Sequence, residues 1–305
     1  MATLKDIKAR IHAVANIKKI TKAMQLVAAA KLTRAQERAH TVRPYADELD
    51  GILGALAAAG GSDDSGDDRI DMRFGDDDAP ISTTRARFFE QTEAKRPAVV
   101  LFTSDRGLCG AFNTNLIRAT RAFLSEHSGE DCKLVTIGKK GHQFFRRQKV
   151  DIVLHHEGVS DKLILPDIKT ITGELVNLYV SGDVDAIYFI YAKSLKASNY
   201  KVITQKFLSI PPVETETSAS HDYIMEPDRD AMFAQLIPLY ATTTVFSALA
   251  DSFASEYGAK MAAMQHATKN AEEKLDALII LRNRLRQATI TRELAEIVGG
   301  AEAIS

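Results

Sequence analysis

Apolar residues recur about every 3.5 positions along both ends of the chain, the spacing that keeps one face of a helix against a partner helix. No Gly or Pro interrupts residues 2–43 or 259–298, and uninterrupted patterns of this length are typical of coiled coils, repeats or membrane spans rather than of globular domains. The N-terminal seam comprises Leu4, Ile7, Ile11, Val14, Ile17, Ile20, Met24, Val27, Leu32, Ala35, Ala39 and Val42. The C-terminal seam comprises Phe246, Leu249, Phe253, Tyr257, Met261, Met264, Thr268, Ala271, Leu275, Leu278, Leu281, Leu285 and Ala288.

The two seams predict an antiparallel coiled coil, with an N-terminal helix at 1–58 and a C-terminal helix that follows a connecting segment within 213–305. Thr3, followed three residues later by Asp6, approximates the capping box that starts a helix. Helices of roughly 50–60 residues would reach about 75–90 Å at ~1.5 Å per residue, longer than a compact domain. Such a rod predicts a mechanical or scaffolding role. The alternative is a bundle in which these helices fold back on a core, although globular helices average about 11–12 residues.

Between these ends, residues 97–212 have the pattern of a small Rossmann-like α/β domain. Short apolar runs rich in β-branched residues predict strands, several of them continuous, as expected for a sheet covered on both faces. Segments with helical periodicity separate the earlier strands and predict crossover helices. The predicted strands are 98–104, 133–138, 151–156, 186–193 and 201–210, and the predicted helices are 111–126, 139–148 and 166–180.

Residues 59–96 have the composition of an acidic linker. Eight aspartates lie between Gly60 and Pro80, mixed with Gly and Ser and with few apolar residues. Such a segment buries too little apolar surface to offset its ordering entropy, so we expect it to be disordered. Spaced aspartates also suggest calcium, but the ligand order, central Gly and closing Glu of a calcium-binding loop are absent from the sequence.

Composition narrows the class of protein. The 305 residues are 45% hydrophobic and include two cysteines, Cys109 and Cys132. Two cysteines are too few for a disulfide framework and fit a reducing compartment. The sequence has no signal-peptide core at its start and no run of 18 apolar residues. We therefore expect a protein that is soluble, or at most peripheral to a membrane.

Charge is distributed unevenly, although the net charge is only -1. Residues 1–43 contain ten Lys or Arg against two acidic residues, and four arginines lie near the end of the C-terminal helix. A basic shaft could bind nucleic acid, an anionic membrane surface or an acidic protein surface, or could be a solvated face. Nucleic acid is the weaker choice, because the first 44 residues lack the aromatic side chains that stack on bases.

None of the candidate chemical motifs is complete. The turn at 103–110 follows the first strand, where a dinucleotide-binding fold would hold phosphate, but G-x-G-x-x-G is absent. Residues 138–141, Gly-Lys-Lys-Gly, do not complete a phosphate-binding loop either. His155 and His156 are neighbours on a strand and point to opposite faces, which is poor geometry for a shared metal. Cys109 could be a reactive thiol at a helix start or a structural thiol. We therefore predict no catalytic residue, metal or cofactor.

Four motifs occur in order along the chain: KKITKAMQLVAAAKL at 18–32, SDRGLCGAFN at 104–113, Y-x-x-E-P-D at 223–228 and ITRELAEIVGGA at 290–301. In this order, and over the whole chain, they resemble the gamma subunit family of the F-type ATP synthase. The resemblance implies a non-catalytic rotor shaft that couples ion flow through the membrane sector to conformational change at the beta-subunit catalytic sites. The implied partners are three alpha and three beta subunits per gamma, the epsilon subunit and the c-ring. The implied location is the cytoplasmic face of a bacterial plasma membrane.

The resemblance also assigns roles to individual residues. It implies contact with a beta subunit for Lys18, Lys19, Met24, Arg106, Cys109, Arg286 and Gln287, and contact with the c-ring or epsilon for Tyr223, Met225 and Glu226. The family often has Tyr where this chain has Met225. The end of the last helix, 294–304, is expected in an apolar sleeve of the alpha–beta ring. The thiol-regulated insertion of chloroplast relatives needs two further cysteines, so redox control by that route is not expected.

Two other interpretations stay open at this point. A small-molecule enzyme with a nucleotide-binding α/β domain predicts stoichiometric nucleotide binding by the isolated chain. A coiled-coil scaffold without rotary function predicts a self-paired oligomer, whereas a shaft made from its own two ends should enter a complex as one copy.

Overall fold

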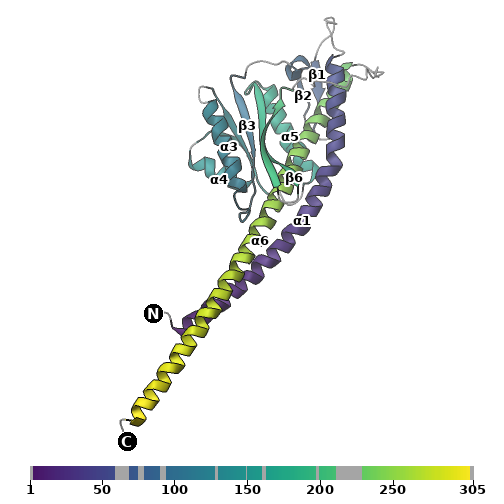
Figure 1. Ribbon diagram of the computed structural model, residues 1–305. Coiled ribbons are helices and arrows are strands. Elements are labelled where there is room, and N and C mark those ends of the chain that lie inside the picture. Colours follow the sequence, from purple (N-terminus) through teal and green to yellow (C-terminus); the bar gives the residue numbers. More distant parts are fainter. Residues whose placement is uncertain are drawn as a thin grey trace. The chain divides into compact units, whose positions relative to one another are not determined.

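The computed structural model describes residues 3–58, 69–74, 79–89, 94–127, 130–148, 150–159, 163–196, 199–210 and 229–302 (Figure 1). The chain divides into two compact units. The first is Met1–Ala30 with Lys260–Ser305, and the second is Lys31–Ala259. The terminal helices, α1 (Leu4–Ala58) and α6 (Arg229–Glu302), each contribute residues to both units.

Both terminal helices are longer than their uninterrupted apolar patterns. Helix α1 begins with the predicted capping box, since the backbone N–H of Asp6 donates to Thr3 Oγ1 at 3.2 Å and that of Thr3 donates to Asp6 Oδ2 at 3.0 Å. Helix α1 continues through Pro44 and α6 through Pro238. A proline usually interrupts a helix because it lacks an amide hydrogen. Around Pro238, burial of neighbours such as Ile237, which is 0% exposed, offsets this cost.

In the first unit, α1 and α6 run antiparallel, as their seams predict. Lys18 Nζ lies 2.7 Å from Glu272 Oε1, and the hydroxyl oxygens of Thr21 and Thr268 lie 2.8 Å apart. A later residue of α1 thus meets an earlier residue of α6, which is the signature of antiparallel pairing.

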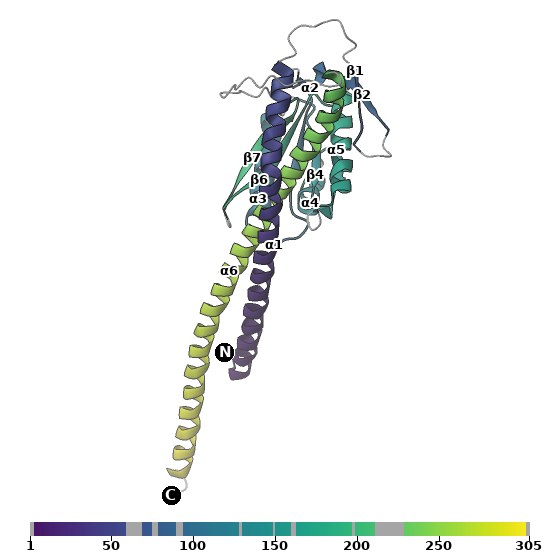
Figure 2. The same cartoon turned by 90° about the vertical axis from the view of Figure 1, so that its right-hand side faces the viewer.

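The predicted seam of α6 is confirmed as far as Leu278. Met264, Ala271 and Leu278 are 5%, 7% and 7% exposed. Beyond this point Leu281 is 43% exposed, and every residue in 286–298 is exposed. Helix α6 continues past the start of α1 (Figures 1 and 2). Among the described residues of the first unit, no helix lies beside the last turns of α6.

The predicted seam of α1 is wrong between residues 17 and 27. The apolar spacing places Ile17, Ile20 and Val27 in the seam, but these side chains are 50%, 59% and 58% exposed. Ala28, which the spacing leaves out, is only 2% exposed. In this stretch the less exposed positions of α1 include Lys18, Thr21 and the predicted seam residue Met24, and both Lys18 and Thr21 meet polar partners on α6.

The second unit contains a five-stranded sheet with the order β5-β4-β3-β6-β7. All neighbouring strands are parallel except β6 and β7, which form an antiparallel pair. Strand β3 is buried at every residue, as its continuous apolar run predicts. The strands are β3 (Pro97–Phe102), β4 (Lys133–Ile137), β5 (Ile152–His156), β6 (Ala186–Lys196) and β7 (Asn199–Leu208).

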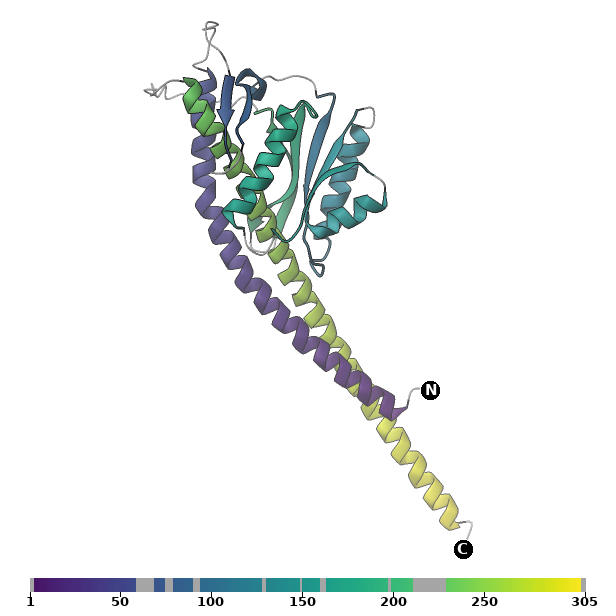
Figure 3. The ribbon, with the colours of Figure 1, turned by 180° about the vertical axis from the view of Figure 1, so that it is seen from behind.

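Helices cover both faces of this sheet (Figures 1 and 3). Helices α3 (Phe112–Glu126) and α4 (Lys139–Arg147) lie on one face, and α5 (Leu165–Val180) lies on the other. Phe112 and Phe123 of α3 pack in the apolar core of the first face. The predicted strands and crossover helices of the α/β domain are therefore confirmed, with ends that shift by a few residues.

A second, two-stranded sheet lies in the segment predicted to be a disordered linker. Its side chains alternate, so that Ile70 and Met72 are 2% and 0% exposed while their neighbours face outward. The prediction of disorder is wrong for these residues, because alternate apolar side chains are enough to bury one face of a short strand. The remaining aspartates, in 59–68 and 75–78, lie outside the described residues. The elements are β1 (Arg69–Met72), β2 (Ile81–Thr84) and the short helix α2 (Ala86–Phe89).

Within the described part of the chain, one helix is long and apolar enough to cross a membrane by length and composition alone. It is α6, and half of its qualifying 18-residue window is buried. A core helix of a soluble protein has the same properties, and Val245 and Leu249 of α6 are fully buried within the second unit.

Candidate functional site

Five of the residues implied to contact a beta subunit lie in the first unit. On α1, Lys19 is exposed and Met24 is half-buried, and on α6 Arg286 and Gln287 are exposed. The fifth, Lys18, pairs with the partner helix. The exposed members of this set are therefore available on the surface of the coiled coil.

The Lys18 side chain is held by the other helix of the coiled coil. Its hydrogen bond and its charge lower the pKa of the Glu272 carboxyl, which lies 2.7 Å away. The two side chains are 36% and 56% exposed. This pair neutralises one cation of the basic N-terminal helix, so the charge presented to a partner comes from its exposed neighbours, such as Lys19.

The end of α6 carries an uncovered apolar face. Ile290, Leu294, Ile297 and Val298 are 49%, 57%, 68% and 62% exposed. Their spacing of four, seven and eight residues from Ile290 places them on one side of the helix. Contiguous exposed apolar surface of this kind marks a site of interaction with another molecule.

The turn after β3 directs one side chain inward and two outward. Cys109 is 2% exposed, and the Asn113 amide nitrogen lies 3.2 Å from its sulfur. Arg106 is exposed, and Leu108 is 62% exposed with a left-handed φ of 67°. A non-glycine residue at positive φ is uncommon and indicates a constrained turn. Cys109 is thus a structural thiol, and Arg106 and Leu108 are the side chains that can meet a partner directly.

A carboxylate of the chain itself occupies the edge of the sheet where a nucleotide-binding fold would hold phosphate. Asp105 follows β3 and accepts the backbone N–H groups of Lys139 at 3.0 Å and Gly158 at 3.1 Å. Lys139 is the first residue of α4, and amides at a helix start otherwise attract external anions. Asp105 therefore gives these turns a structural role, which weighs against a nucleotide-binding enzyme.

Close packing at Gly138 fixes the same edge. Gly138 has a φ of 98°, and a Cβ atom at this position would lie 2.0 Å from the Thr103 carbonyl oxygen. The backbone N–H of Gly141 donates to Thr103 Oγ1 at 2.9 Å. Glycine is required at position 138 for both its backbone conformation and its lack of a side chain.

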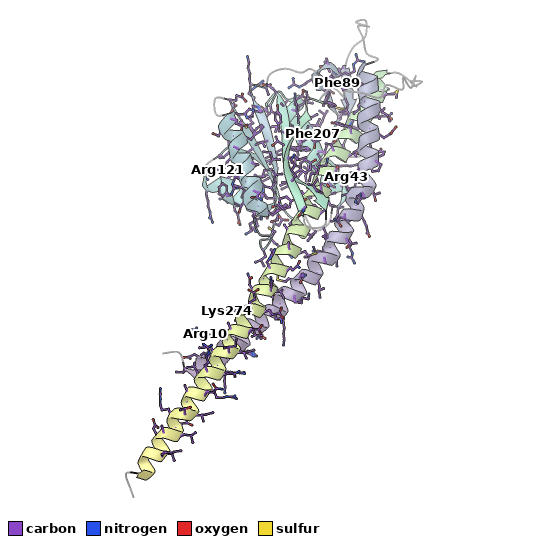
Figure 4. All side chains as sticks on the ribbon, in the orientation of Figure 1. Arg10, Arg43, Phe89, Arg121, Phe207 and Lys274 are labelled. Atoms are coloured by element: carbon purple, nitrogen blue, oxygen red, sulfur yellow. The ribbon has the colours of Figure 1, made fainter. Side chains whose placement is uncertain are left out.

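An ion pair between a buried carboxylate and a partly exposed arginine, which sequence reasoning missed, lies in the second unit, where Figure 4 labels Arg43. Arg43 Nη2 lies 2.6 Å from Asp251 Oδ1 and donates to the Ser194 carbonyl oxygen at 3.2 Å. It therefore joins α1, α6 and β6. The Asp251 side chain is 3% exposed, and burial raises its pKa although Arg43 pulls it down. The count of charged residues assigns Arg43 to the basic surface of the N-terminal helix. The sequence signal that could have corrected this assignment is Asp251, an acidic residue within the apolar part of the C-terminal helix.

The histidines of β5 point to opposite faces, as predicted. The His155 ring stacks on His142 with ring centroids 3.7 Å apart, and His156 Nε2 lies 2.8 Å from Glu174 Oε2. Among the described residues, no cluster of three or more His, Cys, Asp or Glu side chains could hold a metal ion.

The residues implied to contact the c-ring or epsilon, Tyr223, Met225 and Glu226, lie outside the described residues. Their assignment stays a prediction.

Comparison with known proteins gives one consistent family. The family model described as ATP synthase matches residues 3–304. The chain is 39% identical over 305 residues to the ATP synthase gamma chain of Desulfitobacterium hafniense, and the match covers 100% of both chains. It is 38% identical over 304 residues to the ATP synthase gamma chain of Moorella thermoacetica, again with 100% of both chains covered.

Solved structures with a similar fold come from mitochondrial ATP synthases. A chain in the central stalk and c-ring of the Tetrahymena thermophila enzyme has a TM-score of 0.60 and 24% identity, covering 81% of this chain and 99% of that chain. A chain of the Euglena gracilis enzyme has a TM-score of 0.64 and 16% identity, covering 99% of this chain and 94% of that chain. At these identities the likeness concerns the fold.

Proposed function

The chain belongs to the ATP synthase gamma-chain family, and we propose that, as the central-stalk rotor of that enzyme, it transmits torque without catalysing a reaction itself. Ion flow through the membrane sector turns the shaft, and the shaft changes the conformation of the beta-subunit catalytic sites. The observation that carries this proposal is the antiparallel pairing of the two chain ends in a protein that matches gamma chains along its whole length.

Rotation acts through differences between the faces of the shaft. A rotor can bias a catalytic site only if its contacts differ between the open and closed states of that site. One side of the end of α6 is apolar, while the exposed residues Arg292 and Glu296 lie on the opposite side of the helix. Each orientation of the shaft therefore presents a different chemistry to each of the three beta subunits.

Exposed cations suit an acidic surface on the beta subunits. Electrostatic attraction acts over about a Debye length, roughly 8–10 Å at ordinary salt, and does not require tight interlocking. Lys19, Arg106 and Arg286 are the implied beta-contact cations that are exposed. Leu108, beside Arg106, adds an apolar contact, whereas buried Cys109 acts by holding the turn.

The apolar end of α6 is proposed to turn inside the ring of alpha and beta subunits. Leu294→Asn and Ile297→Asn should lower the yield of assembled complex, because they place amides where an apolar sleeve is expected. Glu296→Gln, at an exposed polar neighbour, is the matched control and should assemble normally. Normal assembly of both asparagine variants would contradict this placement.

The remaining assignments complete the proposed complex. One copy of this chain joins three alpha and three beta subunits, contacts epsilon and the c-ring through the segment that includes Tyr223, Met225 and Glu226, and lies at the cytoplasmic face of the bacterial plasma membrane. Attachment to the membrane is through the complex.

The test is gentle affinity purification of the chain from its native membranes, with native mass spectrometry and an ATPase assay on the same sample. We expect one copy with three each of two larger ATP-binding subunits. Recovery as a homo-oligomer without such partners, under conditions that preserve other membrane complexes, would instead support a coiled-coil scaffold.

A further inference from the structure

The second unit contains an apolar groove. Its volume is about 460 Å³, and residues of α1, α5, α6 and the segment after β1 line it. Binding sites for small molecules typically have about 300–1,000 Å³, mostly apolar walls and a few polar groups. The groove is thus of the size and character of a ligand site.

The walls of the groove are apolar and partly uncovered. Tyr45, Leu165 and Leu239 line it and are 48%, 50% and 40% exposed. Phe74 and Phe246 also line the groove, and Phe74 is only 4% exposed. Three large apolar side chains gathered at one groove expose surface that an apolar ligand would remove from water.

The polar groups of the groove select the charge of its ligand. Arg73 and Lys169 line it, and no Asp or Glu is present among the described residues that do so. Arg73 is exposed and Lys169 is half-buried, so both can reach a ligand at the opening. Thr242 and Thr243 add hydroxyl groups that can donate hydrogen bonds.

We propose that this groove binds a free fatty acid, with the hydrocarbon chain against the apolar walls and the carboxylate beside Arg73 and Lys169. A guanidinium can hold a carboxylate through two hydrogen bonds, and hydrogen bonds between charged partners are stronger than neutral ones. An uncharged or cationic amphiphile lacks this contribution. None of the residues implied to contact a beta subunit lines this groove.

The test titrates dodecanoate, below its micelle concentration, into the purified complex that contains this chain, with isothermal titration calorimetry as the readout. We expect saturable binding of one dodecanoate per copy of the chain. Dodecanol and dodecylammonium should bind about tenfold more weakly or worse, because one charge-assisted contact is of that order. The same titration on the isolated full-length chain should give the same affinity.

Substitutions in the chain separate this site from general adsorption. Arg73→Gln with Lys169→Gln should weaken dodecanoate binding about tenfold or more, and circular dichroism should show an unchanged fold. Arg121→Gln is the matched control, because Arg121 is an exposed cation of α3 on the other face of the sheet, labelled in Figure 4. Three results would overturn the proposal. The first is equal affinity for dodecanoate in all variants, and the second is equal affinity of the chain for the three amphiphiles. The third is binding by the isolated chain that is lost in the complex because a subunit covers the groove.

Discussion

Replacing Arg43 with Met should destabilise the second unit more than replacing its partner Asp251. The Asp251 side chain is 3% exposed, so loss of Arg43 leaves a buried carboxylate without its nearest cation. Removing one partner of a buried pair costs about 3–5 kcal/mol. We expect the lower end of this range, because Lys193 also lowers the pKa of Asp251 and compensates in part.

Removing the other partner of the pair, Asp251, should destabilise the fold less. Asp251→Asn leaves Arg43, whose side chain is 34% exposed and can turn toward water while keeping its bond to the Ser194 carbonyl. We expect about 1–2 kcal/mol for this variant. The double variant Arg43→Met/Asp251→Leu should recover most of the loss, because apolar residues of similar volume often replace a buried ion pair without cost.

Urea unfolding of the full chain, followed by circular dichroism at pH 7, measures these differences as shifts in the midpoint at constant slope. The pH dependence adds an independent check. Burial raises the pKa of Asp251 in the folded chain, and loss of Arg43 should raise it further. A carboxyl with a raised folded-state pKa stabilises the fold below its unfolded pKa, about 3.9, and loses that contribution as pH rises. The deficit of Arg43→Met should therefore shrink as the pH falls from 7 to 4.

A control separates this buried pair from surface pairs. Lys269 and Glu273 lie 3.9 Å apart with side chains 75% and 66% exposed, so Lys269→Met should change stability by less than about 0.5 kcal/mol. Two results would refute the reasoning: a larger loss for Asp251→Asn than for Arg43→Met, or a deficit of Arg43→Met that does not change with pH.

Three further predictions use the same unfolding assay. Gly138→Ala should cost at least about 2 kcal/mol, because the backbone is strained for alanine and the new Cβ would lie 2.0 Å from the Thr103 carbonyl oxygen; a loss below about 0.5 kcal/mol would contradict this packing. Burial and a neighbouring imidazole lower the pKa of His142, so stability should fall as the pH drops below its unfolded pKa of about 6.5, and His142→Gln should flatten that fall. Val27→Asn, at a side chain 58% exposed, should change stability by less than about 0.5 kcal/mol, whereas Ala28→Asn, at one 2% exposed, should cost about 1–3 kcal/mol; the opposite order would restore the seam predicted from spacing.

The α/β domain could be predicted from the sequence because each local signal agreed with the tertiary environment. The run at 98–104 is continuously apolar, and the corresponding strand β3 is buried on both faces. The helical segment at 111–126 places Phe112, Leu116 and Phe123 on one side, and these three side chains form part of one core.

The small sheet at β1 and β2 was missed because composition was averaged over a long segment. Asp and Gly dominate residues 59–80, which hides the short alternation in which Ile70 and Met72 face inward. A four-residue strand carries too little signal to outweigh such flanks, and its stability depends on packing against the rest of the unit. Likewise, the partner of Arg43 is 208 residues away in the sequence, and no local pattern connects them.

The wrong seam in α1 has a physical cause that bears on function. Apolar spacing shows that one face of a helix avoids water, but it does not show which neighbour covers that face. In the first unit α1 meets α6 through Lys18 and Thr21, while Ile17, Ile20 and Val27 are left exposed. A coiled coil that served only to pair with itself would bury its largest apolar side chains in its own seam. The exposed ones are therefore best explained by cover from other subunits, which is what the proposed rotor requires and what a self-contained scaffold does not.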